Sequence, residues 1–296
     1  MSFDLDQNNE INNDSINKGE AFCRELARSH YENFSVAARV LPRQKRQDLY
    51  NIYAFCRLAD DFADCSKSTE EAGRNLSDWE NLLEAAASGD VKNPLFNALG
   101  NTIRRQKLSL EPFKRLIKAF KLDLVKSRYA TRSELSEYTH LSANPVGTIV
   151  LELYGYRNPA FFALSDKICT ALQLANHWQD VADDYARGRI YIPFEDMKRH
   201  NVSENTIAGK DANQNFRALI REEVDYARSL FADGKDLISL VHGWLRLQLG
   251  LYFEGGMSAL SAIERNNYDV LNHTSKLRKI DKLKVLFKSS LYLFAR

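Results

Sequence analysis

Two pairs of aspartates, each four residues apart, lie in stretches that otherwise read as buried helix. Asp60 and Asp64 lie in YNIYAFCRLADDFADC, and Asp180 and Asp184 lie in LQLANHWQDVADDYARGR. In a helix, side chains four residues apart project from one face. Burying a carboxylate is costly unless a cation or several donors meet it. The two pairs therefore predict two carboxylate sites that bind a hard divalent cation through oxygen.

Each pair continues backwards along its predicted helix as a polar stripe. Tyr53 and Arg57 precede the first pair at helical spacing, and Gln173 and Asn176 precede the second. One such pair alone would usually be a solvated acidic face, but here the stripe recurs on a second apolar helix. Mg²⁺ keeps waters and binds one or two carboxylates together with substrate phosphate, so we expect several Mg²⁺ ions to hold a diphosphate between the pairs. The chemistry that needs this arrangement is the departure of diphosphate, whose developing charge the metal neutralises.

The composition favours an all-α chain that forms a single helical domain. Of 296 residues, 44% are hydrophobic, but only 13 are glycine and 6 are proline, fewer turn residues than hairpins and crossovers require. The net charge of +2 gives no indication of a nucleic-acid partner. The four cysteines fit neither a zinc site nor a secreted disulfide framework, and no stretch approaches the roughly 20 apolar residues that span a bilayer. A cytoplasmic protein with reduced thiols is expected.

Periodicity and turn residues predict the order of the helices. The predicted ranges are about 20–39, 42–65, 69–88, 94–107, 109–127, 131–153, 158–188, 211–231, 235–264 and 273–294. Pro145 should interrupt the helix over 131–153, because proline removes a backbone donor, and RIYIP (189–193) should be extended. Residues 1–19 are acidic and rich in asparagine, so we expect a disordered tail before a domain over 20–296. A bundle with its site between helices is the simplest architecture.

These motifs resemble those of the squalene and phytoene synthases, the head-to-head isoprenyl diphosphate synthases. YAFCRLADDFAD resembles the first aspartate motif of that family, and LQLANHWQDVADDYARGRIYIP resembles the second. HYENFSVAARVLP, EYTHLSANPVG and NNYDVL resemble its N-terminal, central and late segments. The resemblance implies an isoprenoid synthase fold around a central active-site cavity, with Mg²⁺ and an isoprenoid diphosphate substrate at its mouth.

The resemblance also assigns roles to individual residues. It gives metal binding and catalysis to the four aspartates and further catalytic roles to Tyr138 and Tyr191. The substrate-binding residues that it implies are His30, Phe34, Tyr53, Arg57, Val146, Gln173, Asn176, Gln179 and Tyr268. Each tyrosine could equally be a core aromatic with a satisfied hydroxyl. Arg57 could equally form a structural salt bridge with Asp60 or Asp61.

Two departures from the family pattern indicate one branch of it. Most members have arginine immediately before the first aspartate of the second motif, where this chain has Gln179, and the usual VAGxVG is SANPVG here. Both features are similar to the bacterial hydroxysqualene synthases of hopanoid pathways, which convert presqualene diphosphate and water to hydroxysqualene. This implies that no NADPH is used, and that a presqualene diphosphate synthase acts upstream and a hydroxysqualene reductase downstream. Ser142, Asn144 and Gln179 are the polar candidates for positioning the water.

Other functions remain open from the sequence. The same family includes enzymes that condense two allylic diphosphates to presqualene diphosphate, squalene or phytoene, but glutamine cannot replace arginine as a bidentate anion clamp. Non-catalytic scaffold relatives lack the aspartates that this chain keeps. Terpene cyclases and chain-elongating prenyltransferases have different second motifs. The C-terminal KLRKIDKLKVLFKSSLYLF is either an ordinary amphipathic helix or a peripheral membrane contact on anionic lipid.

Overall fold

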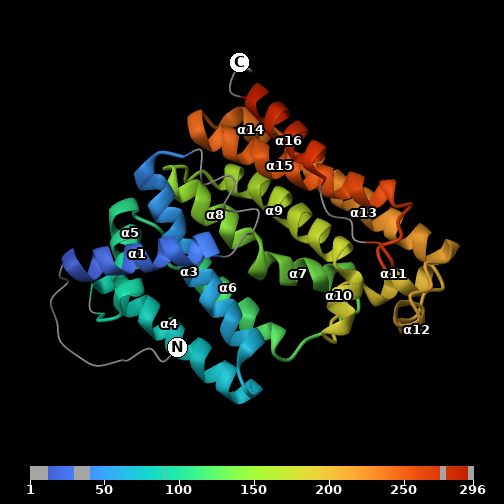
Figure 1. Ribbon diagram of the computed structural model, residues 1–296, viewed down its shortest axis with the longest axis horizontal. Helices are drawn as coiled ribbons and strands as arrows, with labels where there is room; N and C mark the ends of the chain where they lie inside the picture. Colours follow the sequence, from blue (N-terminus) through green and yellow to red (C-terminus); the bar gives the residue numbers. More distant parts are fainter. Residues whose placement is uncertain (1–12, 30–40, 90, 274–277, 293–296) are drawn as a thin grey trace. The chain divides into compact units, whose positions relative to one another are not determined.

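The protein is all-α in the part of the chain that the computed structural model describes, which is residues 13–29, 41–89, 91–273 and 278–292. The helices, labelled in Figure 1, are α1 (Asn13–Ser29), α3 (Arg43–Cys65), α4 (Thr69–Ser88), α5 (Pro94–Gln106), α6 (Glu111–Asp123), α7 (Arg132–Ser142), α8 (Asn144–Leu153), α9 (Pro159–Gln179), α10 (Val181–Ala186), α11 (Phe194–Arg199), α12 (Glu204–Ala208), α13 (Gln214–Gly234), α14 (Asp236–Leu240), α15 (Gly243–Arg265) and α16 (Lys279–Leu291). The prediction of an all-α chain is confirmed. Within the described ranges, no helix is both long and apolar enough to cross a membrane.

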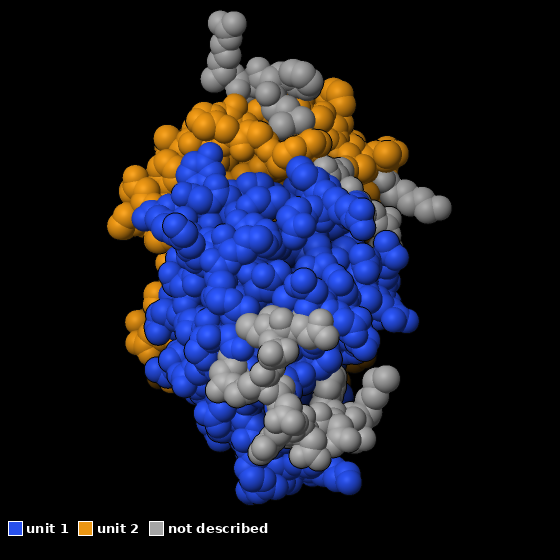
Figure 2. Space-filling model, turned by 90° about the vertical axis from the view of Figure 1, so that its left-hand side faces the viewer, with its two compact units in different colours: residues 1–125, 149–157 blue, residues 126–148, 158–296 orange. Residues whose placement is uncertain are grey.

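The helices group into two compact units, coloured separately in Figure 2. One comprises residues 1–125 and 149–157, and the other comprises residues 126–148 and 158–296. The first unit contains α3 with the first aspartate pair. The second contains α9 and α10 with the second pair, so each pair is supported by its own set of neighbouring helices.

An aromatic cluster holds the second half of α3 in the first unit. Phe55 is fully buried and stacks on Trp79 of α4 at 5.9 Å between ring centroids. Its edge contacts are with Phe96 of α5 and Phe113 of α6, at 6.2 and 5.4 Å. The Trp79 indole N–H donates to the carbonyl of Phe55 at 3.3 Å. Because buried aromatic rings contribute large apolar areas, this cluster fixes the helix immediately before Asp60.

A buried polar network fixes the first half of the same helix. The Asp48 side chain is inaccessible to solvent and pairs with Arg105 of α5. The same carboxylate accepts hydrogen bonds from Gln106 Nε2 at 2.9 Å and Thr102 Oγ1 at 3.3 Å. One turn later, Asn51 Nδ2 donates to Thr102 Oγ1 at 3.1 Å. A buried charge that is paired and hydrogen-bonded in this way sets the register of α3 against α5.

The expected disordered tail is partly wrong, because α1 begins at Asn13 rather than near residue 20. Two interactions hold this first part of the helix. Asn97 Nδ2 of α5 donates to Ser15 Oγ at 2.8 Å, and Gly19 lies so close to α5 that an added Cβ would overlap the carbonyl of Pro94. The polar composition suggested disorder, but contacts with a neighbouring helix order this part of the chain, and composition does not reveal such contacts. Residues 1–12 lie outside the described residues.

In the second unit, α9 packs along α13 and α15. Trp178 near the end of α9 is fully buried, and its indole N–H donates to the carbonyl of Glu223 on α13 at 3.2 Å. Ala171, Leu174 and Ala175 bury the same side of α9. Its remaining side carries the polar stripe with Gln173 and Asn176.

Several helix boundaries differ from the predictions. The interruption near Pro145 is confirmed, with Ala143 between α7 and α8. The helix predicted over 158–188 breaks at Asp180, between α9 and α10. The helix predicted over 235–264 is divided at Val241 and His242, and α15 begins at Gly243, which has a φ of 61°. The short helices α11 and α12 were not predicted, because five or six residues carry too little periodicity to identify a helix.

Candidate active site

The first aspartate pair lies on the last two turns of α3. Tyr53 is buried, Asp60 has 42% of its side chain exposed, and Asp64 is exposed. The stripe therefore runs from the core of the first unit to its surface within eleven residues. Because solvent exposure increases along the stripe, both carboxylates are accessible to an ion from solvent, while Tyr53 at the start of the stripe is held in the core.

Arg57 forms ion pairs with the acidic residues that follow it on α3. Its Nη2 lies 2.6 Å from Asp61 Oδ1, and its Nη1 lies 3.4 Å from Asp60 Oδ2. The structural salt bridge considered from the sequence is therefore present. The shorter of the two contacts goes to Asp61. A part-exposed guanidinium in this position also stays within reach of an anion bound at the pair.

The second aspartate pair spans the break between α9 and α10. Asp180 has φ −106° and ψ 15°, outside the helical region, yet the backbone bonds continue on both sides of it. Its N–H donates to the carbonyl of Asn176 at 3.0 Å, and the N–H of Asp184 donates to the carbonyl of Asp180 at 2.8 Å. The i, i+4 relation predicted for Asp180 and Asp184 is therefore preserved across the bend.

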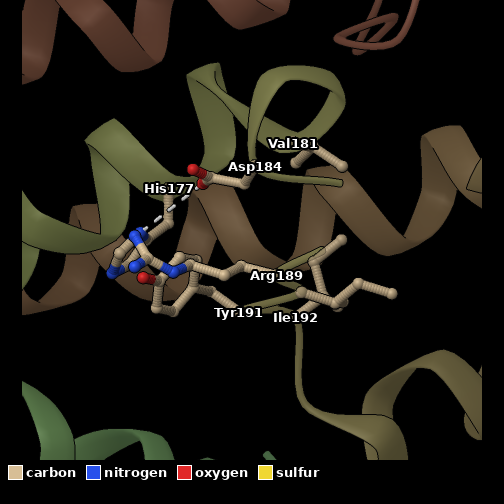
Figure 3. A pocket seen from close by; sticks show the side chains of 7 residues that line it. His177, Val181, Asp184, Arg189, Tyr191 and Ile192 are labelled. Atoms are coloured by element: carbon tan, nitrogen blue, oxygen red, sulfur yellow. Dashed lines mark ion pairs between the residues drawn. The ribbon is translucent and has the colours of Figure 1, made fainter. Parts of the chain in front are cut away.

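Asp184 lines a small pocket in the second unit (Figure 3), together with His177, Val181, Arg189, Ile190, Tyr191 and Ile192. Burial raises the pKa of Asp184 to about 7, and the negative charges of Asp180 and Asp183 act in the same direction. Arg187 and Arg189 oppose this shift without cancelling it. The pocket thus contains a carboxyl group whose negative charge is not fully compensated by the neighbouring residues.

His177 joins the pocket to the polar stripe of α9. Its Nδ1 lies 3.9 Å from Asp184 Oδ2, the contact drawn as a dashed line in Figure 3, and its Nε2 lies 3.3 Å from Gln173 Nε2. Burial lowers the pKa of His177 to about 3, so the imidazole is neutral. With the Gln173 amide as donor to Nε2, the ring carries its proton on Nδ1, the nitrogen nearer to Asp184.

Tyr191 is held by an aromatic cluster and by backbone hydrogen bonds. It stacks on His177 and lies 5.6 Å from Tyr138 and 5.8 Å from Tyr129 between ring centroids. The extended segment that contains it runs beside residues 127–130, with the N–H of Ile190 donating to the carbonyl of Ser127 at 2.9 Å. The predicted residues Tyr138 and Tyr191 are therefore brought together with the second aspartate pair.

The central motif brings α8 against α9. An added Cβ on Gly147 would overlap Ser165 Oγ of α9, so glycine permits this close approach. Asn144 is buried, and its Oδ1 accepts from Thr170 Oγ1 at 2.9 Å. The Ser142 hydroxyl is buried with no hydrogen-bond partner among the described residues. Val146 is half-buried beside them.

The remaining predicted residues differ in their placement. Gln179 is half-buried at the end of α9, and Asn176 is exposed one turn before Asp180. Tyr268 lies in the turn after α15 with a φ of 59°, below the guanidinium of Arg221 at 4.9 Å. No contact between described residues joins it to the second pair, so its predicted substrate role gains no structural support. His30 and Phe34 lie outside the described residues.

The donor set fits Mg²⁺. Among the described residues, no three His, Cys, Asp or Glu side chains gather closely enough to hold an ion. Each pair instead offers two carboxylates, which is what Mg²⁺ takes from a protein when phosphate and water complete its coordination. A cation at Asp180 and Asp184 would also favour the charged form of Asp184, against the burial that raises its pKa. Asp60 and Asp64 would hold ions in the same way in the first unit.

Sequence reasoning missed three residues of the second site: His177, Arg189 and Tyr129. His177 stands four residues after Gln173, and Arg189 follows the motif within two turns, so both spacings were visible in the sequence. Tyr129 carried no such signal. It reaches the site only because residues 127–130 lie beside residues 190–195 in the fold.

The chain matches known proteins over most of its length. Residues 27–282 match the family model described as squalene/phytoene synthase. The chain is 28% identical to a phytoene synthase of Arthrospira platensis over 263 residues, covering 84% of this chain and 85% of that protein. It is 29% identical to the 15-cis-phytoene synthase of Synechococcus elongatus over 276 residues, covering 86% of this chain and 87% of that protein.

Solved structures extend the match to the fold. The crystal structure of squalene synthase HpnC from Alicyclobacillus acidocaldarius is 41% identical with a TM-score of 0.82, covering 87% of this chain and 97% of that chain. A dehydrosqualene synthase in complex with a ligand is 27% identical with a TM-score of 0.85, covering 95% of this chain and 98% of that chain. The fold type predicted from the sequence is thereby confirmed.

Proposed function

The chain belongs to the squalene/phytoene synthase family, and we propose that within it the protein converts presqualene diphosphate and water to hydroxysqualene, releasing diphosphate. The observation that carries this proposal is the neutral Gln179 immediately before Asp180. An arginine there would add a cation beside a site that must hold two diphosphates. A substrate with a single diphosphate needs less positive charge, and a buried unpaired cation would be costly.

The reaction begins when the C–O bond to diphosphate breaks. Bond cleavage leaves a cyclopropylcarbinyl cation, whose ring opens; a water oxygen then bonds to the cation and loses one proton to give the alcohol. A divalent ion held by the aspartates would neutralise the charge on the departing diphosphate. Arg57, Arg187 and Arg189 supply further positive charge beside the two pairs. The electrons balance without a reductant, so no NADPH is needed.

Ser142 is the strongest of the three polar candidates for positioning the attacking water. It lies four residues after Tyr138 on α7, so the two side chains share a face of the helix. The Asn144 carbonyl oxygen already accepts from Thr170, whereas the buried Ser142 hydroxyl has no hydrogen-bond partner among the described residues. Buried polar groups usually have a partner, and a water molecule would supply one.

The clustered tyrosine rings of the second site support a carbocation reaction. Tyr129, Tyr138 and Tyr191 lie within 5.8 Å of one another between centroids. Aromatic faces attract a cation, by up to about 2 kcal/mol when both are desolvated. The same buried rings exclude bulk water, so the water that reacts would have to be a bound one.

Condensation of two allylic diphosphates is the second function, favoured by the similarity to phytoene synthases. Product analysis separates the two. We expect presqualene diphosphate with Mg²⁺ to give hydroxysqualene in the same amount with and without NADPH, and farnesyl or geranylgeranyl diphosphate alone to give no product. Formation of presqualene diphosphate or phytoene from those substrates, or of squalene only with NADPH, would reassign the chain.

Under our proposal, an enzyme that makes presqualene diphosphate must act before this protein, and a reductase of the alcohol must act after it.

A further inference from the structure

The outer face of α16 is apolar, the reverse of an ordinary surface helix. Within the described ranges, nine large hydrophobic side chains are exposed, and five of them lie on this helix of 13 residues. They are Ile280, Leu283, Leu286, Phe287 and Leu291, with Leu283 and Phe287 exposing 65% and 67% of their surface. Single exposed apolar residues are normal in soluble proteins. A concentration of them on one element indicates an interaction surface.

The opposite face of α16 is fixed to α15. Arg265 Nη2 lies 2.9 Å from Asp281 Oδ2, and the Tyr292 hydroxyl donates to Glu254 Oε1 at 3.0 Å. Gly250 of α15 makes room for the Tyr292 ring, which would lie 2.7 Å from an added Cβ. Asp281, Val285 and Ser289 are buried at this contact. The helix is thus anchored by one face, and its apolar face points away from α15.

Lysines border the apolar face on both sides. At ~100° per residue, the five apolar side chains centre opposite the buried face, with Lys282 at one border and Lys284 at the other. Lys288 lies nearer the buried face, and its Nζ is 3.3 Å from Glu254 Oε2 of α15. The one acidic residue of α16, Asp281, is buried beneath Arg265 and Arg278. Among the described residues, Lys282 and Lys284 have no ion-pair partner, so the outer surface of α16 is apolar at its centre and cationic along its edges.

We propose that α16 is a membrane-docking helix that lies in the surface of an anionic lipid bilayer, with Leu283 and Phe287 at the centre of the inserted face. Apolar side chains would enter the boundary between head groups and acyl chains, and the bordering lysines would extend to the phosphates. A second copy of this chain fits the face less well. Two such faces would bring lysines together with no exposed carboxylate of α16 to meet them.

Co-sedimentation with lipid vesicles tests the proposal. We expect the protein to sediment with vesicles of phosphatidylcholine and phosphatidylglycerol, to remain in solution with phosphatidylcholine alone, and to be released by salt. The double variant Leu283→Ser/Phe287→Ser should bind the anionic vesicles at least about tenfold more weakly, and Lys282→Gln/Lys284→Gln should also bind them more weakly than the wild type.

The matched control is Val125→Ser/Phe194→Ser, which removes two exposed apolar side chains, 77% and 59% exposed, from elsewhere in the chain and should bind vesicles like the wild type. Circular dichroism melting of each variant confirms that it folds. The proposal fails if the wild type does not sediment, or if Leu283→Ser/Phe287→Ser binds as the wild type does. A lipid-free dimer in sedimentation velocity that this variant dissociates would overturn it in favour of a second copy.

Discussion

The Nδ1 of His177 lies 3.9 Å from Oδ2 of Asp184, a contact that is charged on both sides only when the imidazole is protonated. Burial keeps the imidazole neutral by lowering its pKa to about 3, and it raises the pKa of the carboxyl to about 7. The stack of His177 on Tyr191, with centroids 3.7 Å apart, holds the ring in this position. Asp184 therefore stands in surroundings that disfavour its charge until a cation arrives.

The variant Asp184→Asn should separate activity from stability. Loss of the metal-binding oxygen should lower turnover by at least about 100-fold, roughly 3 kcal/mol in the activation free energy. The neutral amide no longer suffers the cost of burying a charge, so the free energy of unfolding at neutral pH should be equal or higher. Steady-state kinetics and urea unfolding measure both quantities. The control is Asp183→Asn, at the exposed neighbouring residue, which should keep near wild-type turnover. Chelation of Mg²⁺ should abolish turnover in the wild type and in this control. Wild-type turnover in Asp184→Asn would contradict the site.

Ser142→Ala should change the product rather than the fold. If the hydroxyl positions the attacking water, its loss should divert the cation to proton loss, so that the fraction of alkene rises relative to the alcohol. Gas chromatography with mass detection of the products from presqualene diphosphate measures this ratio. Ser289→Ala removes another buried hydroxyl without a described partner, far along the chain on α16, and should leave the ratio unchanged. An unaltered ratio in Ser142→Ala would exclude this role.

Gly19→Ala and Gly73→Ala should shift stability in opposite directions, although both glycines lie inside helices. Alanine is favoured over glycine in a helix by about 0.5–1 kcal/mol. At Gly73 of α4 no atom lies within 4 Å of an added Cβ, so this gain should be realised. At Gly19 the Cβ would overlap the Pro94 carbonyl, and separation of α1 from α5 should cost about 1–3 kcal/mol. Chemical denaturation measures both; an unaffected Gly19→Ala would show that α1 does not pack on α5.

Much of the fold follows from the sequence, for reasons visible in particular elements. The helix predicted over 42–65 is α3 over Arg43–Cys65, and that over 69–88 matches α4, because both combine apolar periodicity with clear ends. The second aspartate pair keeps its predicted spacing even across the bend at Asp180. The spacings of His177 and Arg189 were visible in the sequence, but the role of Tyr129 was not predictable, since it depends on how residues 127–130 and 190–195 pair. The start of α1 depends likewise on its contact with α5.

Glu223 should make the free energy of unfolding depend on pH. Its side chain is 1% exposed, and burial raises its pKa from 4.5 to about 7, although Arg132 Nη2 at 3.0 Å acts in the opposite direction. The folded state therefore holds this proton more tightly than the unfolded state, so stability falls as pH rises from about 4.5 to 7. The loss is on the order of 3 kcal/mol at about 1.4 kcal/mol per pKa unit. Glu223→Gln keeps an acceptor for Arg132 without titrating.

Urea unfolding of the wild type and Glu223→Gln between pH 5 and pH 8 measures this contribution by difference. The free energy of unfolding of the wild type should decline relative to that of the variant as pH increases. Parallel curves for the two proteins would show that Glu223 ionises in the folded state as it does in the unfolded chain.

The origin of the product oxygen tests the proposed function most directly. We incubate the protein with presqualene diphosphate and Mg²⁺ in water enriched in ¹⁸O, without NADPH, and weigh the alcohol by mass spectrometry. Capture of the cation by water predicts hydroxysqualene that carries one ¹⁸O atom at the enrichment of the solvent. An unlabelled alcohol would place the oxygen in the diphosphate ester and exclude water capture, and a hydrocarbon without oxygen would contradict hydroxysqualene formation altogether.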